Sequence, residues 1–308
     1  MSKTSVIAIA LLAVALVAPL FVYPVTLMTI LCFIVFACSF NLLLGYTGLL
    51  CFGHAMFFGS AAYVAGWLMK TYGLTPEMGI LAGGLFSAAL GLLVGIIAVR
   101  KSGITFAMIT FAIAQFVYFI LLRSPFTGGE DGLQKIPREP VLGLIDVTRN
   151  FNYYYVVLAI TVLAVFFFYR IVHSPFGEIL KAIRDNDARV ESLGMKPERY
   201  KLMALVLSAG LAGVAGAMKA SVFQFATLTD VSFPISTEVI IMTLLGGLGT
   251  LFGPMVGAGF IIYLNEYLAS FGEWALISQG IILLLVILFL RRGIVGEFNA
   301  WMKRRQAS

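Results

Sequence analysis

Residues 174–201 read SPFGEILKAIRDNDARVESLGMKPERYK and form the only long charged run of the chain. Apolar segments flank this run at residues 152–172 and 202–223, and each is long enough to cross a bilayer as a helix of about 20 residues. We therefore predict a hydrophilic loop held between two membrane-spanning helices.

The composition of the whole chain agrees with this interpretation. Hydrophobic residues make up 60% of the 308 residues and charged residues only 12%, and the mean hydropathy is +0.98. A water-soluble domain does not bury so much apolar surface. We predict an all-α, polytopic helical membrane protein of about eight full spans plus a glycine-broken re-entrant pair, which gives about 8 to 10 helices. The predicted spans are 5–22, 24–44, 52–69, 78–99, 103–122, 152–172, 202–223 and 274–290.

The segment 236–268 departs from the pattern of full spans. The sequence GGLGTLFGP at residues 246–254 divides it into two apolar pieces, each short for a full crossing. We predict a pair that enters and returns on the outer side.

Charge placement sets the predicted orientation. Short cytoplasmic loops are enriched in Lys and Arg, which favours a cytoplasmic 174–201 loop, cytoplasmic N- and C-termini and an extracytoplasmic loop at 123–151. Residues 1–308 then form one transmembrane domain. The net charge of +6 is divided among separate loops and termini, so it indicates contact with a lipid bilayer and gives no sign of nucleic-acid binding.

A second glycine-rich segment reads NLLLGYTGLLCFGHAMFFGSAAY, at residues 41–63. Its glycine spacing is unusual for a lipid-facing helix and predicts an element that lines a pathway, with Gly45, Gly48 and Gly53 as candidates. His54 has two interpretations. In the first, His54 is functional, because an ionisable residue inside a membrane is energetically costly and is commonly kept for a function. In the second, it is a neutral histidine whose two ring nitrogens form hydrogen bonds that hold the broken backbone together.

Small residues predict which helices pack closely. Ala204, Ser208, Ala212, Gly216 and Ala220 recur every four residues. A similar stripe consists of Gly83, Ser87, Gly91 and Gly95. Such faces let helix backbones approach each other, so both helices are expected in the interior of the bundle or at a subunit interface.

The charged run itself contains two short predicted helices, at 176–185 and 187–193. Asn186 is a suitable N-cap for the second helix, Gly194 suits the position after its end, and Pro197 follows closely. A short amphipathic helix in this position can dock in the groove of a soluble partner. The alternative is a solvated loop whose charges only determine topology.

Motifs of enzyme active sites are missing from the sequence. It contains no GxxxxGK[ST] phosphate-binding loop, no GxSxG nucleophile elbow and no pair of histidines in zinc-ligand spacing. We therefore predict no catalytic site, no metal site and no enzyme activity. The three cysteines are expected to be small buried residues, and TGGEDGL at 127–133 is expected to be a surface turn rather than a calcium site. Energy for any transport must then come from another polypeptide or from an ion gradient.

Four stretches in this order resemble the LivM-type permease subunit of branched-chain amino acid ABC transporters. They are residues 41–63, TGGEDGL at 127–133, the run from Ser174 with SAGLAGVAGAM at 208–218, and TLLGGLGTLFGPMVGA at 243–258. The resemblance covers nearly the whole chain. One small departure is Cys51, where the family suggests serine.

The resemblance implies a machine of several subunits. It implies a second, LivH-like permease subunit, two cytoplasmic ABC ATPase subunits, a periplasmic substrate-binding protein and a bacterial inner-membrane location. The chain itself would bind no cofactor, because the partner subunits hydrolyse the ATP. The implied ATPase-coupling residues are Arg184, Asp187, Arg189, Glu191 and Gly194. The implied translocation-path residues are Gly45, Gly48, Gly53, His54, Gly246, Gly247 and Gly249.

The expected substrates are leucine, isoleucine and valine, carried by an importer. Urea, short amides or other amino acids are alternatives on the same scaffold. A gradient-driven carrier is the alternative from another class of transporter. Carboxylates and lysines in the middle of spans, which such a carrier commonly uses, are nearly absent from the predicted spans.

Overall fold

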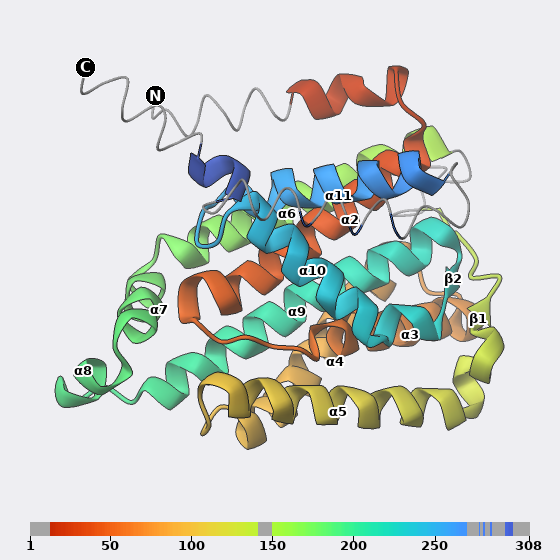
Figure 1. Cartoon of the computed structure of the whole chain (residues 1–308). Coiled ribbons are helices and arrows are strands. Elements are labelled where there is room, and N and C mark those ends of the chain that lie inside the picture. Colours follow the sequence, from red (N-terminus) through yellow and green to blue (C-terminus); the bar gives the residue numbers. More distant parts are fainter. Residues whose placement is uncertain are drawn as a thin grey trace, which may run out of the picture.

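The computed structural model describes residues 13–140 and 150–269, together with residues 277, 280, 284 and 293–297 near the C-terminus. The described chain is a bundle of helices, several of which run side by side along its length (Figure 1). The predicted all-α class is confirmed for these residues, with one very short β-ladder added.

The elements follow one another along the chain with these bounds. The first half contains the 3₁₀-helix η1 (Ala18–Leu20), α2 (Pro24–Asn41), the π-helix η2 (Leu42–Thr47), α3 (His54–Tyr72), α4 (Pro76–Ala98), α5 (Gly103–Arg123), the 3₁₀-helices η3 (Pro125–Thr127) and η4 (Gly129–Asp131), and β1 (Leu133–Gln134). The second half contains α6 (Asn150–Val172), α7 (Pro175–Asp185), α8 (Asp187–Ser192), α9 (Pro197–Phe223), β2 (Phe225–Ala226), η5 (Leu228–Val231), α10 (Phe233–Gly246) and α11 (Gly253–Ala269).

Five helices of the described chain are long and apolar enough to cross a membrane. They are α2 continued through η2, α4, α5, α6 and α9. The predicted span 52–69 corresponds to α3, which is not one of these five because His54, Lys70 and several small residues make it less apolar. The predicted spans 5–22 and 274–290 lie mainly outside the described residues, as do both termini. The structure thus supports five of the eight predicted full spans.

The predicted broken pair is a helical hairpin. Helix α10 has 14 residues and α11 has 17, and the two pack against each other across the turn at 247–252. Gly246 and Gly257 allow the close approach, because a Cβ at either position would overlap a backbone carbonyl of the opposite helix or of the turn. The glycine-rich turn lies beside α7, which places it at the same end of the bundle as α8 (Figure 1).

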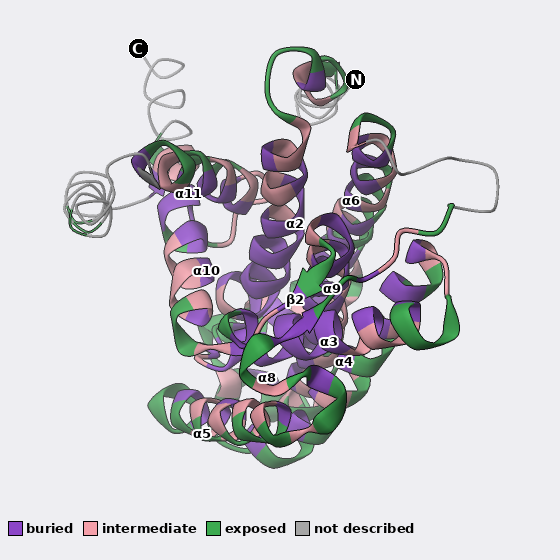
Figure 2. Cartoon of the chain, turned by 90° about the vertical axis from the view of Figure 1, so that its right-hand side faces the viewer, coloured by how far each residue is buried: buried purple, intermediate pink, exposed green. Residues whose placement is uncertain are grey.

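Helix α9 lies at the centre, in contact with α2, α3 and α4. Viewed along the bundle, α9, α2 and α3 are mostly buried, whereas α5 has a largely exposed surface (Figure 2). The two predicted small-residue stripes meet here. A Cβ at Gly91 would come within 2.5 Å of the Cβ of Ala209, and one at Gly83 within 2.9 Å of the Cβ of Ala217. Both stripes are faces of close helix packing, as predicted, and the structure adds that they pack against each other.

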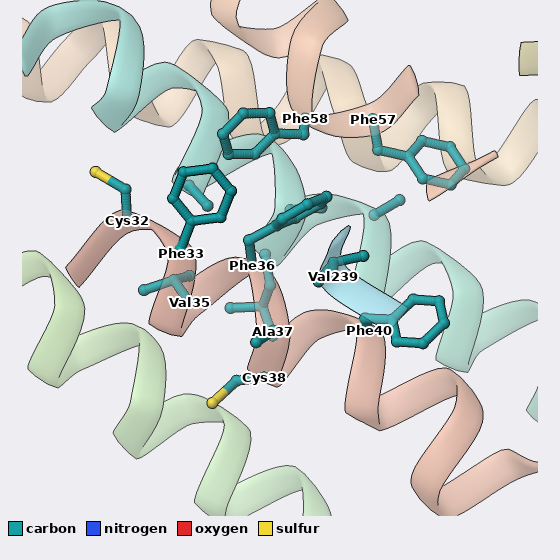
Figure 3. Close-up of a cluster of buried hydrophobic side chains, with 14 of the residues drawn as sticks. Cys32, Phe33, Val35, Phe36, Ala37, Cys38, Phe40, Phe57, Phe58 and Val239 are labelled. Atoms are coloured by element: carbon teal, nitrogen blue, oxygen red, sulfur yellow. The ribbon is translucent and has the colours of Figure 1, made fainter. Parts of the chain in front are cut away.

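An aromatic core fills the space between α2, α3 and α10 (Figure 3). The rings of Phe36 and Phe58 are 4.5 Å apart, and Phe33 lies 5.8 Å from Phe58. Cys32, Cys38 and Cys51 are free and buried, as the sequence predicts. Burial of these large rings stabilises the packing of α2 against α3.

Arg138 anchors the end of the bundle opposite α8. Its guanidinium donates to the backbone carbonyls of Ser221, at 3.0 Å, and Val222, and to Asn150 Oδ1 at 2.8 Å. Burial lowers the pKa of Arg138, and the ring of Tyr153 lies 4.9 Å away under the cation. Nearby, β1 pairs antiparallel with β2, with Leu133 opposite Ala226. The segment that contains TGGEDGL is thus tied to the end of α9, and Glu130 and Asp131 are exposed.

Candidate functional site

The predicted helix 176–185 is α7, and its amphipathic pattern fixes how it lies on the bundle. Ser174 caps it by accepting a hydrogen bond from the backbone N–H of Gly177, and Pro175 follows as the first helical residue. Leu180 and Ile183 are buried, while the opposite face is exposed. Helix α7 therefore packs its apolar stripe against the bundle and against η2.

The predicted helix 187–193 is α8, and its caps are those expected from the sequence. Asn186 Oδ1 accepts from the backbone N–H of Arg189 at 3.1 Å, and Gly194 has φ +82°, the left-handed conformation that ends a helix. Arg189, Glu191 and Leu193 are exposed. The helix thus presents a rigid, charged surface to its surroundings.

One ion pair attaches α8 to α9. Lys201 Nζ donates to Asp187 Oδ2, and the lysine side chain is only 7% exposed. Helix α9 begins at Pro197, five residues earlier than the predicted span at 202, because proline is favoured at the first helical position. A cavity of about 550 Å³ lies beside this junction, and Arg100, Lys101, Asp187, Glu191, Lys196 and Glu198 are among its lining residues.

Arg184 connects α7 to both glycine-broken segments. Its Nη1 donates to the backbone carbonyl of Gly45 in η2. A Cβ at Gly249 would lie 3.1 Å from the same Nη1, and one at Gly48 would lie 3.0 Å from Arg184 Cγ. The structure therefore brings together Arg184, Gly45, Gly48 and Gly249, which the sequence assigned to two separate groups of residues.

Asn41 joins the same two segments directly. Its Oδ1 accepts from the backbone N–H of Gly249 at 3.0 Å, and its Nδ2 donates to the carbonyl of Thr250 at 2.9 Å. Gly45 lies against this contact, since a Cβ there would overlap the Asn41 amide and come within 2.7 Å of Gly249 N. We call Asn41, Gly45, Arg184, Gly249 and Thr250 the inner clasp.

Gly53 and His54 lie apart from the inner clasp, where α3 begins. Gly53 packs on α5, because a Cβ there would come within 2.8 Å of the Cβ of Ala114. His54 is fully buried, and its ring stacks on Phe36 at 5.4 Å between centroids and contacts Phe40 and Phe57 edge to face. The backbone N–H of the next residue, Ala55, donates to Ser236 Oγ at 2.9 Å.

The hydrogen bonds of His54 assign its tautomer. Ser39 Oγ donates to the Phe36 carbonyl at 2.6 Å, so at 2.9 Å it accepts from Nε2–H of His54. Nδ1 has no hydrogen-bond partner among the described residues. The ring therefore ties α3 to α2 through one nitrogen rather than through two.

Gly246 and Gly247 form the start of the turn between α10 and α11. Gly247 has φ +119°, a backbone conformation that glycine adopts readily and other residues rarely do. Gly293 packs closely on it, because a Cβ at Gly293 would come within 2.6 Å of the Gly247 backbone. Within the described residues, no group of three His, Cys, Asp or Glu side chains gathers in a way that would hold a metal ion.

Comparison with known proteins decides the family. The profile of the family described as branched-chain amino acid transport system / permease component matches residues 20–290. The chain belongs to this family. The resemblance inferred from the four sequence stretches is confirmed.

Two LivM proteins illustrate the extent of the likeness to this permease family. The high-affinity branched-chain amino acid transport system permease protein LivM of Salmonella typhimurium is 29% identical over 320 residues, which cover 95% of this chain and 75% of the relative. LivM of Escherichia coli is 28% identical over 299 residues, which cover 90% of this chain and 70% of the relative.

A more distant relative and the solved structures complete the comparison. The probable branched-chain amino acid transport permease protein LivH of Methanocaldococcus jannaschii is 31% identical over 121 residues, which cover 37% of this chain and 38% of that protein. No solved structure matches the chain at a significant level.

Sequence reasoning about this permease-family chain missed Asn41, Lys219 and Asp230. Asn41 stands at the end of an apolar span, and its polarity was the only available signal. Lys219 lies within the predicted span 202–223, and it forms a buried ion pair with Asp230. An ionisable residue inside a span is a functional candidate, which is the signal that would have found this pair.

Proposed function

We propose that this chain is a membrane-spanning permease subunit of an ATP-driven importer for the branched-chain amino acids leucine, isoleucine and valine. One observation carries the proposal: the permease-family profile matches residues 20–290, nearly the entire chain. The likeness to two LivM proteins over at least 90% of this chain supports the substrate class. The chain supplies part of the translocation path and leaves ATP hydrolysis to separate subunits.

The proposed orientation places the α7–α8 segment in the cytoplasm of a bacterial cell and the whole chain, as one permease domain, in the inner membrane. The loop 123–151 is then extracytoplasmic and both termini are cytoplasmic. Lys and Arg enrichment in the loops near α8 supports this orientation.

The proposed partners are a LivH-like permease subunit, two cytoplasmic ABC ATPase subunits and a periplasmic substrate-binding protein. The partial match to a LivH protein supports a permease pair built from related chains. The exposed charged surface of α8 and the absence of a phosphate-binding loop motif from the sequence support docking of a separate ATPase.

The inner clasp suggests how the proposed ATPase movement reaches the translocation path. Helix α8 follows α7 directly, and Arg184 of α7 contacts η2 and the 247–252 turn. A rigid-body shift of α7 and α8 would therefore pull on both glycine-broken segments together, and the Asn41 side chain would keep them in register. In this mechanism Arg184, Asp187, Arg189, Glu191 and Gly194 transmit motion. Gly45, Gly48 and Gly249, with Gly246 and Gly247, form the segments that move.

Reconstitution of the complete complex in proteoliposomes tests this proposal. With loaded binding protein and internal ATP, we expect uptake of radiolabelled leucine that persists when an uncoupler collapses the ion gradients. Vesicles without the ATPase subunits are the control and should show no uptake. Uptake that an uncoupler abolishes at constant ATP would instead establish a gradient-driven carrier. Competition by unlabelled urea, acetamide or other amino acids, compared with isoleucine and valine, decides the substrate range.

A further inference from the structure

A buried ion pair lies far from the inner clasp, near the β1–β2 end of the bundle. Lys219 of α9 binds Asp230 of η5, and their side chains are 16% and 2% exposed. Charged groups inside a membrane protein are costly, and they are commonly found where a polar substrate or ion must pass. The proposed coupling mechanism does not use this pair.

The pair is held in place from both sides. Asp230 Oδ2 accepts from the backbone N–H and from the hydroxyl of Thr227, at 3.4 and 3.3 Å, so the η5 turn fixes the carboxylate. Lys219 Nζ lies 5.8 Å from the ring centre of Phe58 and 5.9 Å from that of Phe223. Asp230 is its only hydrogen-bond partner among the described residues.

Helix α3 adds a hydroxyl without a partner. Gly59 packs directly on η5, because a Cβ there would come within 2.7 Å of the Asp230 carbonyl carbon. Tyr63 follows one turn later on the same face of α3, is fully buried, and interacts electrostatically with Asp230. The Tyr63 hydroxyl has no hydrogen-bond partner in the described part of the chain.

A second carboxylate lies within electrostatic range of Lys219. Glu238 of α10 accepts from Asn265 Nδ2 at 2.8 Å and interacts with Lys219. The region therefore combines one cation, two carboxylates, a free hydroxyl and aromatic rings. Aromatic walls with a few convergent polar groups are typical of a small-molecule site.

We propose that Lys219, Asp230 and Tyr63 form a binding site for the main-chain charges of the transported amino acid. Lys219 binds the substrate carboxylate, Asp230 binds the ammonium, and Phe58 and Phe223 contact the alkyl side chain. A zwitterion replaces each partner of the ion pair with a group of like charge, so no buried charge is left uncompensated. The inference rests on the proposed function and deepens it.

In the proposed site, the joined protein charges of this structure correspond to the closed form. Substrate entry requires η5 to separate from α9. In the open form, the Tyr63 hydroxyl gains a partner in the substrate. This explains why a buried hydroxyl without a partner is kept in the closed form, at the usual cost of desolvation.

Ligand-dependent stabilisation of the purified complete complex tests the site. Its unfolding temperature is measured with leucine, with 4-methylpentanoate, which lacks the ammonium, and with isopentylamine, which lacks the carboxylate. We expect leucine, and neither of the two analogues, to raise the unfolding temperature. Tyr63→Phe removes a buried hydroxyl without a partner among the described residues, so it should not lower the ligand-free unfolding temperature. It should raise the half-saturating leucine concentration about tenfold, as expected for the loss of one hydrogen bond to a charged group. Tyr155→Phe, whose hydroxyl bonds the Leu16 carbonyl instead, is the matched control and should bind leucine like wild type.

A charge exchange distinguishes binding from a structural role. The double variant Lys219→Asp with Asp230→Lys preserves an ion pair but reverses the charges beside Tyr63 and Glu238. We expect a complex that still assembles, as shown by co-purification of its subunits, and at least tenfold slower leucine uptake. Full uptake by this variant, or no leucine effect on the wild-type unfolding temperature, would overturn the site. Wild-type complex without any ATP-dependent uptake would instead refute the proposed function.

Discussion

The side-chain amide of Asn41 accepts a hydrogen bond from the backbone N–H of Gly249 at 3.0 Å, across 208 positions of sequence. The same amide donates to the carbonyl of the next residue, Thr250. Asn41 is fully buried, whereas Gly249 and Thr250 are partly exposed. The glycine-rich turn therefore depends on one side chain for two of its hydrogen bonds.

Asn41→Ala is expected to destabilise the complex and to weaken coupling. The substitution removes both hydrogen bonds to the turn, at a cost of about 0.5–1.5 kcal/mol each. The unfolding temperature and the leucine transported per ATP hydrolysed measure the two effects. Asn150→Ala, which removes the acceptor for Arg138 at the opposite end, is the control and should lower stability alone. Equal transport per ATP in the two variants would contradict a special role for Asn41.

Gly45→Ala is expected to prevent closure of the inner clasp. The added Cβ would overlap the Asn41 amide and would come within 2.7 Å of the Gly249 nitrogen, so backbone must move. We expect uptake to fall at least tenfold with assembly retained, which corresponds to a cost of about 1.4 kcal/mol or more. Gly259→Ala is the control, because the nearest atom to its Cβ would be 3.9 Å away. Normal uptake by Gly45→Ala would show that the segments do not close on each other.

Arg184→Ala is expected to uncouple the ATPases from the path. The variant loses the hydrogen bond to Gly45 while the buried face of α7, with Leu180 and Ile183, stays intact. Stimulation of ATP hydrolysis by loaded binding protein should fall, while basal hydrolysis and subunit stoichiometry stay at wild-type levels. Arg184→Lys should restore part of the stimulation, since lysine offers a donor without the guanidinium geometry. Arg199→Ala, an exposed arginine at the start of α9, serves as the control.

Glu191→Lys tests α8 as the docking element. Glu191 is exposed on a helix whose caps, Asn186 and Gly194, remain in place, so the fold of the chain should not change. We expect an intact complex in which loaded binding protein no longer stimulates ATP hydrolysis. Unchanged stimulation and uptake would mean that the loop only determines topology.

Local signals made α7 and α8 predictable from the sequence. Caps act within one turn, so Asn186 and Gly194 placed the ends of α8 to within about one residue. The small-residue faces of α4 and α9 were equally accessible, because small residues at a four-residue spacing form one face wherever the helix lies. That these two faces pack against each other came only from the structure. The family also followed from the sequence, because its stretches occur in order along nearly the whole chain.

Contacts between distant segments could not be predicted in the same way. Nothing near Asn41 in the sequence indicates a contact with Gly249. Likewise, nothing near Lys219 indicates that Asp230, which follows α9 in η5, is buried and pairs with it. These pairings depend on how α9, α10 and the glycine-broken segments pack. The contact of Arg184 with Gly45 could not be predicted either. The family resemblance implied a coupling role for Arg184, but only the structure shows this contact.

The anchor formed by Arg138 also sets an order of events during synthesis. Its acceptor at Val222 lies 84 residues later in the chain. At about 5–20 residues per second, the ribosome needs roughly 4 to 17 seconds to make that stretch. During this interval Arg138 has no α9 carbonyl to bind, so the segment around Arg138 is not yet attached to this end of the bundle. Only the synthesis of α9 supplies this carbonyl. A nascent chain stalled before Val222 should therefore be cut by a protease between β1 and Arg138, where Leu133 and Ile136 are buried in the finished protein.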